Sequence, residues 1–193
     1  HPAPSSATPS RPTSPPPETR MNELPPDLTP DEIKMIAAQK PVASTLATIV
    51  NQLIMGDIAA AWPKIHHTLR QSWVDQWIDR NRQALTSDGW NLNATGDALA
   101  SSEPSSHELW VHFRRVVHRE IGRYELIVGE FGISTAPRPI APDVELLNLY
   151  PQSPGFHLPG EAHHVVPALM IRENGDWKLL TFDSEELPEA QLN

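Results

Sequence analysis

Residues 168–182, ALMIRENGDWKLLTF, decide the C-terminal half of the fold. Apolar and polar side chains alternate on both sides of Asn174 and Gly175. Asn-Gly between two such runs is typical of a type I′ β-hairpin. The pattern predicts strands over residues 165–172 and 177–182, joined by a tight turn.

Alternation also predicts three strands before this hairpin. In residues 109–114, Leu109, Val111 and Phe113 would point to one side of the sheet and their neighbours to the other. A second strand is expected over 123–133, forming a hairpin with the first around Gly122. A short strand at 144–150 interrupts the Pro-rich connection over 136–159.

The N-terminal part of the chain has helical spacing instead. A short helix is expected over 29–39, and a longer helix after Pro41. Gly56 should end the longer helix, and Asp57 should cap the helix that follows it. The next segment, 58–69, should break at Pro63. A third helix is expected from Ser72 to the Asp88-Gly89 stop signal, with Trp73, Trp77, Ile78 and Leu85 on one side.

Helices followed by antiparallel strands predict an α+β domain, with N-terminal helices packed on one face of a curved antiparallel sheet. Two stretches carry a resemblance to a known family: LIMGDIAAAW at 53–62 and the 168–182 hairpin with its Trp-Lys pair. They resemble the nuclear transport factor 2-like, or SnoaL-like, superfamily over about 41–182. The resemblance implies a cone-like half-barrel with a pocket at its open end. It implies no single reaction, because that superfamily contains isomerases, dehydratases, epoxide hydrolases, secretion-system scaffolds and binding modules.

Composition divides the chain into three parts. Residues 1–28 are rich in Pro, Ser and Thr and are expected to be a disordered linker, 29–183 the half-barrel domain, and 184–193 an acidic tail. A Pro/Ser/Thr spacer behind a non-Met first residue is typical of a chain whose signal peptide or membrane anchor lies upstream. An extracytoplasmic domain, periplasmic or secreted, is therefore expected. Vector-derived sequence before a true start at Met21 is the alternative.

Charge and cysteine content exclude several function classes. The 193 residues carry a formal net charge of −9 and no cysteine. Thiolate nucleophiles, Cys-ligated zinc and iron–sulfur clusters are therefore excluded. No basic footprint for nucleic acid and no apolar run long enough to span a membrane are present in the sequence.

Histidine spacing argues against a metal site, and no cofactor is expected. His112 and His118 are six residues apart, too far along a strand for one metal ion. The adjacent pairs, 66–67 and 163–164, can each turn at most one ring towards a site. His-x-x-x-His is absent from the sequence.

A proton-transfer site would draw on polar side chains that strand alternation could turn to a common side. The candidates are His112, His164, Tyr124 and Tyr150 as acid or base, and Trp110, Arg114 and Trp90 as ligand-binding groups. The alternative for Trp110, His112 and Arg114 is an amphipathic outer face of the sheet. The basic cluster Arg114, Arg115, Arg119 and Arg123 is expected to pair with Glu120, Glu125 and Glu130 across the hairpin.

These patterns favour a non-enzymatic, extracytoplasmic domain for ligand binding or protein association. The first alternative is a small SnoaL-like isomerase, dehydratase or hydrolase acting on an apolar small molecule. The second is a periplasmic scaffold domain of a secretion system. The expected partners are a second copy of the chain, through the sheet face, and a small apolar ligand.

Overall fold

The computed structural model describes residues 41–134, 137–151 and 165–189. Its helical elements are α2 (Pro41–Ile54), α3 (Ile58–Ala61), η1 (Trp62–Lys64), α4 (His67–Ser87), α5 (Leu92–Ala100), η2 (Pro104–Ser106), α6 (Trp110–Ile121) and η3 (Gly122–Tyr124). The strands follow as β1 (Gly132–Ile133), β2 (Arg138–Ala141), β3 (Val144–Tyr150), β4 (Val166–Glu173) and β5 (Asp176–Phe182). The predicted α+β class is confirmed. None of the helices within these ranges is long and apolar enough to cross a membrane.

The sheet is antiparallel, curved and not closed into a barrel. Its strand order is β1-β3-β4-β5, and β2 pairs with β3 beside β1. The β4–β5 hairpin turns at Asn174 and Gly175, whose φ angles are 53° and 92°. Positive φ at both central residues is what a type I′ turn requires, so the predicted hairpin is confirmed.

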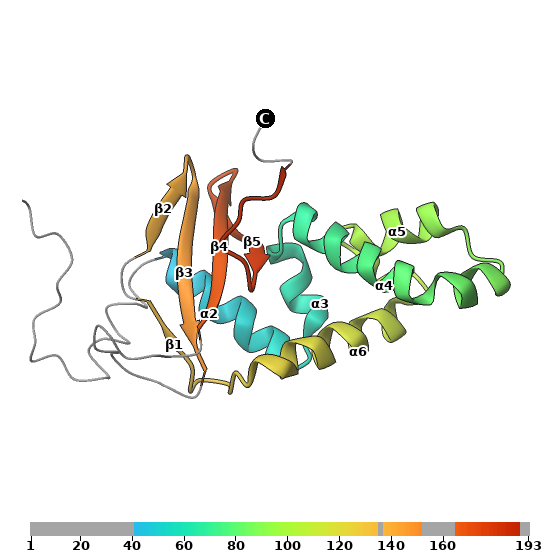
Figure 1. Ribbon diagram of the computed structural model, residues 1–193, viewed down its shortest axis with the longest axis horizontal. Helices are drawn as coiled ribbons and strands as arrows, with labels where there is room; N and C mark the ends of the chain where they lie inside the picture. Colours follow the sequence, from blue (N-terminus) through green and yellow to red (C-terminus); the bar gives the residue numbers. More distant parts are fainter. Residues whose placement is uncertain (1–40, 135–136, 152–164, 190–193) are drawn as a thin grey trace, which may run out of the picture.

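Helices cover one side of the sheet and extend beyond it. Helix α2 lies against the sheet and contacts β5, while α4, α5 and α6 form a helical layer beyond β5 (Figure 1). The main core lies between these layers and includes Leu46, Ile49, Leu53, Trp62, Leu147, Ala168 and Met170, all fully buried. A smaller core on the other face of the sheet contains Val144, Leu146, Leu169 and Leu180.

The junctions predicted between the first helices are also confirmed. Gly56 ends α2 with a φ of 77°, and the Asp57 side chain accepts a hydrogen bond from the Ala60 amide at 3.4 Å. Helix α3 then gives way to the 3₁₀ turn η1, which contains Pro63. A proline has no amide hydrogen to continue the α-helical ladder, so the chain changes direction here.

The predicted strand over 109–114 is wrong, because this stretch begins helix α6. Its buried side chains are Trp110, Phe113, Val117 and Ile121, at spacings of three and four residues. Val111 is 40% exposed whereas Phe113 is 1% exposed, so these two side chains do not share a face. Alternation in this stretch is local, and the longer helical period determines the structure.

The hairpin expected around Gly122 is wrong for the same reason. Residues 123–133 form η3, turns and the two-residue strand β1. Helix α4 begins at His67 rather than Ser72, because the His66 side chain caps it by accepting from the Thr68 amide at 3.4 Å. Helix α5, capped by Asn91, and strand β2 were not predicted. The expected helix at 29–39 and the linker at 1–28 lie outside the described residues.

Candidate functional site

The predicted site residues that the structure describes do not come together. His112 and Arg114 are exposed on α6, and Trp110 lies in the core, 3% exposed, against the ring of Trp62. Trp90 follows α4 and packs on His107, with the ring centroids 5.5 Å apart. Tyr124 and Tyr150 end η3 and β3, respectively, and His164 lies outside the described residues.

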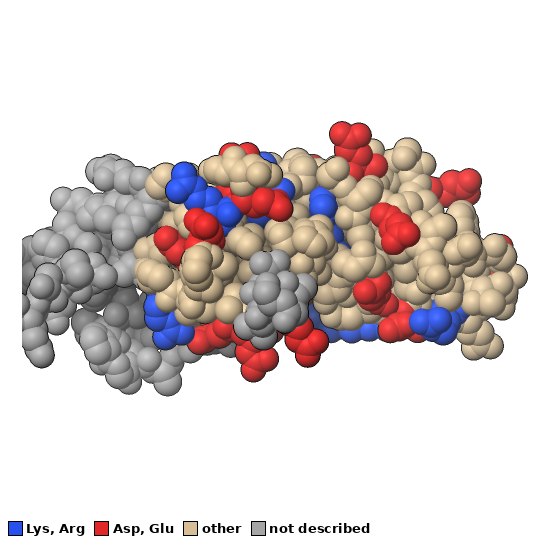
Figure 2. Space-filling model, turned by 90° about the horizontal axis from the view of Figure 1, so that it is seen from above, with Lys and Arg blue, Asp and Glu red and all other residues tan. Residues whose placement is uncertain are grey.

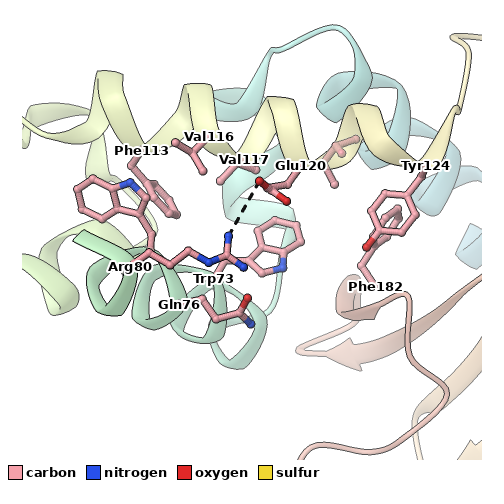
Figure 3. A pocket seen from close by; sticks show the side chains of 11 residues that line it. Trp73, Gln76, Arg80, Phe113, Val116, Val117, Glu120, Tyr124 and Phe182 are labelled. Atoms are coloured by element: carbon pink, nitrogen blue, oxygen red, sulfur yellow. Dashed lines mark ion pairs between the residues drawn. The ribbon is translucent and has the colours of Figure 1, made fainter. Parts of the chain in front are cut away.

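A groove between α4 and α6 is lined by one predicted site residue, Tyr124, and by residues that were not predicted. Its volume is about 240 Å³, and Figure 3 shows its lining from close by. The lining residues are Trp73, Gln76, Trp77 and Arg80 from α4, Phe113, Val116, Val117, Glu120 and Ile121 from α6, Tyr124 from η3 and Phe182 from β5. The signal in the sequence was the spacing of Trp73, Trp77 and Arg80, which places them on one helix face.

Aromatic rings make the groove wall rigid. The ring of Phe113 lies 5.6 Å from that of Trp77 and 5.5 Å from that of Trp62, both edge to face. At the end nearer the sheet, the rings of Tyr124 and Phe182 are 5.0 Å apart at 88°. Edge-to-face pairs of this kind hold their rings in fixed orientations. The groove therefore presents a preformed apolar surface.

The groove lining contains one cation and one anion, Arg80 and Glu120, and two further arginines outside the lining pair with Glu120. The Glu120 carboxylate lies 2.7 Å from Arg123, 3.7 Å from Arg119 and 4.0 Å from Arg80. Figure 3 shows the Arg80 side chain reaching across from α4 towards Glu120. Pairing of Arg119 and Arg123 with Glu120 is as expected, but it runs along α6 and η3 rather than across a hairpin. One carboxylate serves three guanidinium groups.

Tyr124 is held as a neutral phenol at this end of the groove. Its hydroxyl donates a hydrogen bond to Asp183 at 3.2 Å. Burial and the nearby Asp183 carboxylate raise the pKa of Tyr124 to about 12. At neutral pH the hydroxyl is therefore a hydrogen-bond donor and a poor proton acceptor.

The face of the molecule seen in Figure 2 carries charges of both signs. Acidic side chains are scattered over the face in Figure 2, and basic side chains lie among them. Within residues 41–134, 137–151 and 165–189, no three His, Cys, Asp or Glu side chains are grouped closely enough to hold a metal ion. His118 is engaged instead with the Ile54 carbonyl oxygen, 2.9 Å from its Nε2.

Comparison with known proteins adds no assignment to this geometry. The chain matches no protein-family model, no curated protein and no solved structure.

Proposed function

We propose that the chain is a non-enzymatic ligand-binding domain of the half-barrel kind, which binds a small aromatic acid in the α4–α6 groove. The observation that carries the proposal is an aromatic wall beside Glu120, whose carboxylate is shared by Arg80 in the lining and by Arg119 and Arg123 outside it. Apolar walls with a few placed polar groups are the usual composition of small-molecule sites.

The groove's size limits the ligand. Its volume of about 240 Å³ lies below the roughly 300–1,000 Å³ of sites for drug-sized molecules, so one or two fused rings would fill it. Three guanidinium groups around the single Glu120 carboxylate favour a carboxylate on such a ring, since arginine presents donors in a fork that matches two carboxylate oxygens.

The ionisable groups at the groove support binding rather than catalysis. Glu120 is ion-paired, and Tyr124 keeps its proton at neutral pH with a pKa of about 12. General acid–base catalysis needs a group whose pKa lies near the working pH and which reaches the reacting atom. Tyr124 does not meet the first condition, and the Glu120 carboxylate is held by guanidinium groups.

Calorimetric titration with naphthoate and with the neutral naphthylmethanol tests this proposal. Naphthoate should bind more tightly, because the guanidinium groups around Glu120 attract its carboxylate. Val116→Phe fills the groove from α6 and should abolish binding, whereas Val111→Phe, on the same helix but outside the groove, should not. Equal binding by both variants would place the ligand elsewhere and overturn the proposal.

Protein association is the second candidate, and exposed apolar side chains favour it. Met55 is 69% exposed, and Ile127 and Val128 are 42% and 44% exposed. The Gly129 amide donates to Asn51 Oδ1 at 3.2 Å, which brings this loop against the C-terminal half of α2. Contiguous apolar side chains on a surface are typical of protein contacts.

Sedimentation velocity over a hundredfold range of protein concentration tests this candidate. A dimer that weakens in Ile127→Lys and persists in Thr48→Lys, on the exposed side of α2, would support association through this loop. A chain that stays monomeric throughout would exclude self-association, including the homodimer expected through the sheet face.

A further inference from the structure

The first turn of α4 is fastened to the edge strand of the sheet. The His66 amide donates to the Leu179 carbonyl oxygen at 2.8 Å, and Ile65 forms a parallel bridge with Leu179. His66 is 3% exposed, and its Nδ1 accepts from the Thr68 amide. Since Nδ1 is the acceptor, the ring proton of a neutral His66 lies on Nε2, which faces Glu173 Oε1 at 4.0 Å.

Five charged or titratable side chains meet around this junction. Glu173 is ion-paired with Lys178, and this hydrogen bond is the main reason that the pKa of Glu173 is lowered. Burial, with smaller contributions from His67 and Arg70, lowers the pKa of His66, so its imidazole is neutral at pH 7. Arg70 and Lys178 against the single carboxylate of Glu173 leave an excess of one positive charge.

Arg70 carries that excess charge in a buried position. It is 9% exposed, and its guanidinium has no hydrogen-bond or ion-pair partner among the described residues. The Arg70 Nε and the Thr68 hydroxyl are both buried, and neither has a hydrogen-bond partner among the described residues. Arg70 lies within electrostatic range of His66 and Glu173, so its guanidinium faces the same cluster.

Other arginines show the opposite arrangement. Those that form ion pairs, Arg80, Arg82, Arg119, Arg123 and Arg138, have side chains 61–69% exposed. Arg70 is buried, whereas the other arginines with no ion pair in the described ranges, Arg114, Arg115 and Arg172, are exposed. A buried charge is strongly destabilising unless it is paired, and arginine does not escape by losing its proton.

We propose that this charged cluster at the start of α4 binds a small oxyanion, a carboxylate or a phosphate. The Arg70 guanidinium would donate two hydrogen bonds to it. The amino end of a 21-residue helix adds a field of the favourable sign. One bound monoanion would cancel the excess charge of the cluster. The site is separate from the α4–α6 groove, so the two proposals fail independently.

Thermal melts in inorganic phosphate and in acetate, each against chloride of equal ionic strength, test the proposal. At a hundredfold excess over Kd the bound anion should raise Tm by about 5–11 °C. Phosphate acting alone would identify a phosphate group as the ligand, and acetate acting alone a carboxylate. No shift with either ion would overturn the proposal.

Two variants place the effect on Arg70. Arg70→Gln should lose the anion-dependent rise in Tm, whereas Arg82→Gln, on the exposed side of the same helix, should keep it. In chloride alone, Arg70→Gln should melt no lower than the unsubstituted chain, because it removes an unpaired buried charge. A lower melting temperature there would mean that Arg70 pairs with Glu173 in solution, which also overturns the proposal.

A direct measurement covers the case in which Arg70→Gln does not fold. In the nitrogen-15 spectrum of the unsubstituted protein, a guanidinium Nε–H resonance absent from Arg70→Lys belongs to Arg70. That resonance should move on titration with the active anion and stay fixed with chloride. A resonance that does not move under saturating anion contradicts binding at Arg70.

Discussion

Replacing Phe113 by alanine should destabilise the domain far more than replacing Val111, two residues earlier on α6. Phe113 is 1% exposed, and its ring contacts those of Trp62, Trp77 and Trp110 at 5.5, 5.6 and 5.9 Å. Removing a buried phenyl ring costs about 3–5 kcal/mol, and the loss of several ring pairs places this site at the upper end of that range.

The matched change at Val111 should have almost no effect. Its side chain is 40% exposed, and surface substitutions of this kind stay within about 0.5 kcal/mol. For a domain of this size, about 4–5 kcal/mol at Phe113 corresponds to a fall in Tm of about 8–20 °C. Urea unfolding followed by tryptophan fluorescence and by circular dichroism gives both free energies of unfolding.

The comparison distinguishes a helix from a strand over 109–114. Residues 111 and 113 lie on the same face of a strand but far apart around a helix. If Val111→Ala and Phe113→Ala lower the free energy of unfolding by similar amounts, the two side chains share a buried face. That result would refute the assignment of α6 and the groove built on it.

Three further substitutions or conditions have defined outcomes. Gly56→Ala should lower the free energy of unfolding by about 1–2 kcal/mol in a thermal melt, because φ is 77° and the new Cβ would lie 3.3 Å from an imidazole carbon of His118. Gly122→Ala, with a φ of −58° and open space around the new Cβ, should be neutral or slightly stabilising. In a Tyr150→Phe background, ultraviolet titration should give Tyr124 a pKa of about 12, and a lower pKa would contradict its burial. Because this pKa is higher in the folded chain than in the unfolded chain, the free energy of unfolding should fall as pH rises from about 10 through 12. Burial lowers the pKa of His66 below its usual 6.5, so as pH falls the imidazole of the unfolded chain is protonated before that of the folded chain. The free energy of unfolding should therefore decrease as pH falls below about 6.5. His66→Gln should make the free energy of unfolding less dependent on pH in this range.

Local signals in the sequence predicted the parts of the fold that depend on short-range chemistry. Asn174-Gly175 determines a turn by its backbone preference alone, and Gly56-Asp57 ends one helix and caps the next. At 109–114 two periods fit the same few residues. Only the continuation to Val117 and Ile121 shows that the helical period is the real one.

The candidate sites were beyond sequence reasoning because they join distant elements. Trp77 and Phe113 form one wall only when α4 and α6 pack together. From the sequence alone, Arg70 is indistinguishable from an ordinary polar residue on the exposed face of an amphipathic helix. Its significance depends on burial near Glu173, on a hairpin about a hundred residues later in the chain.

The bridge between Ile65 and Leu179 has a consequence for how the chain reaches its native state. It joins a segment near the start of the described chain to the last strand of the sheet, and α2 and α4 also pack on that strand. Contacts of such sequence separation raise contact order and slow folding, because a large loop must close before the contacts form. During synthesis, α2 and α4 would emerge from the ribosome before β5, the strand on which they pack, and their apolar faces would stay exposed until β5 is made. Native packing of this domain should therefore be completed only after translation of β5, and these helices are the part of the chain that a chaperone would have to protect.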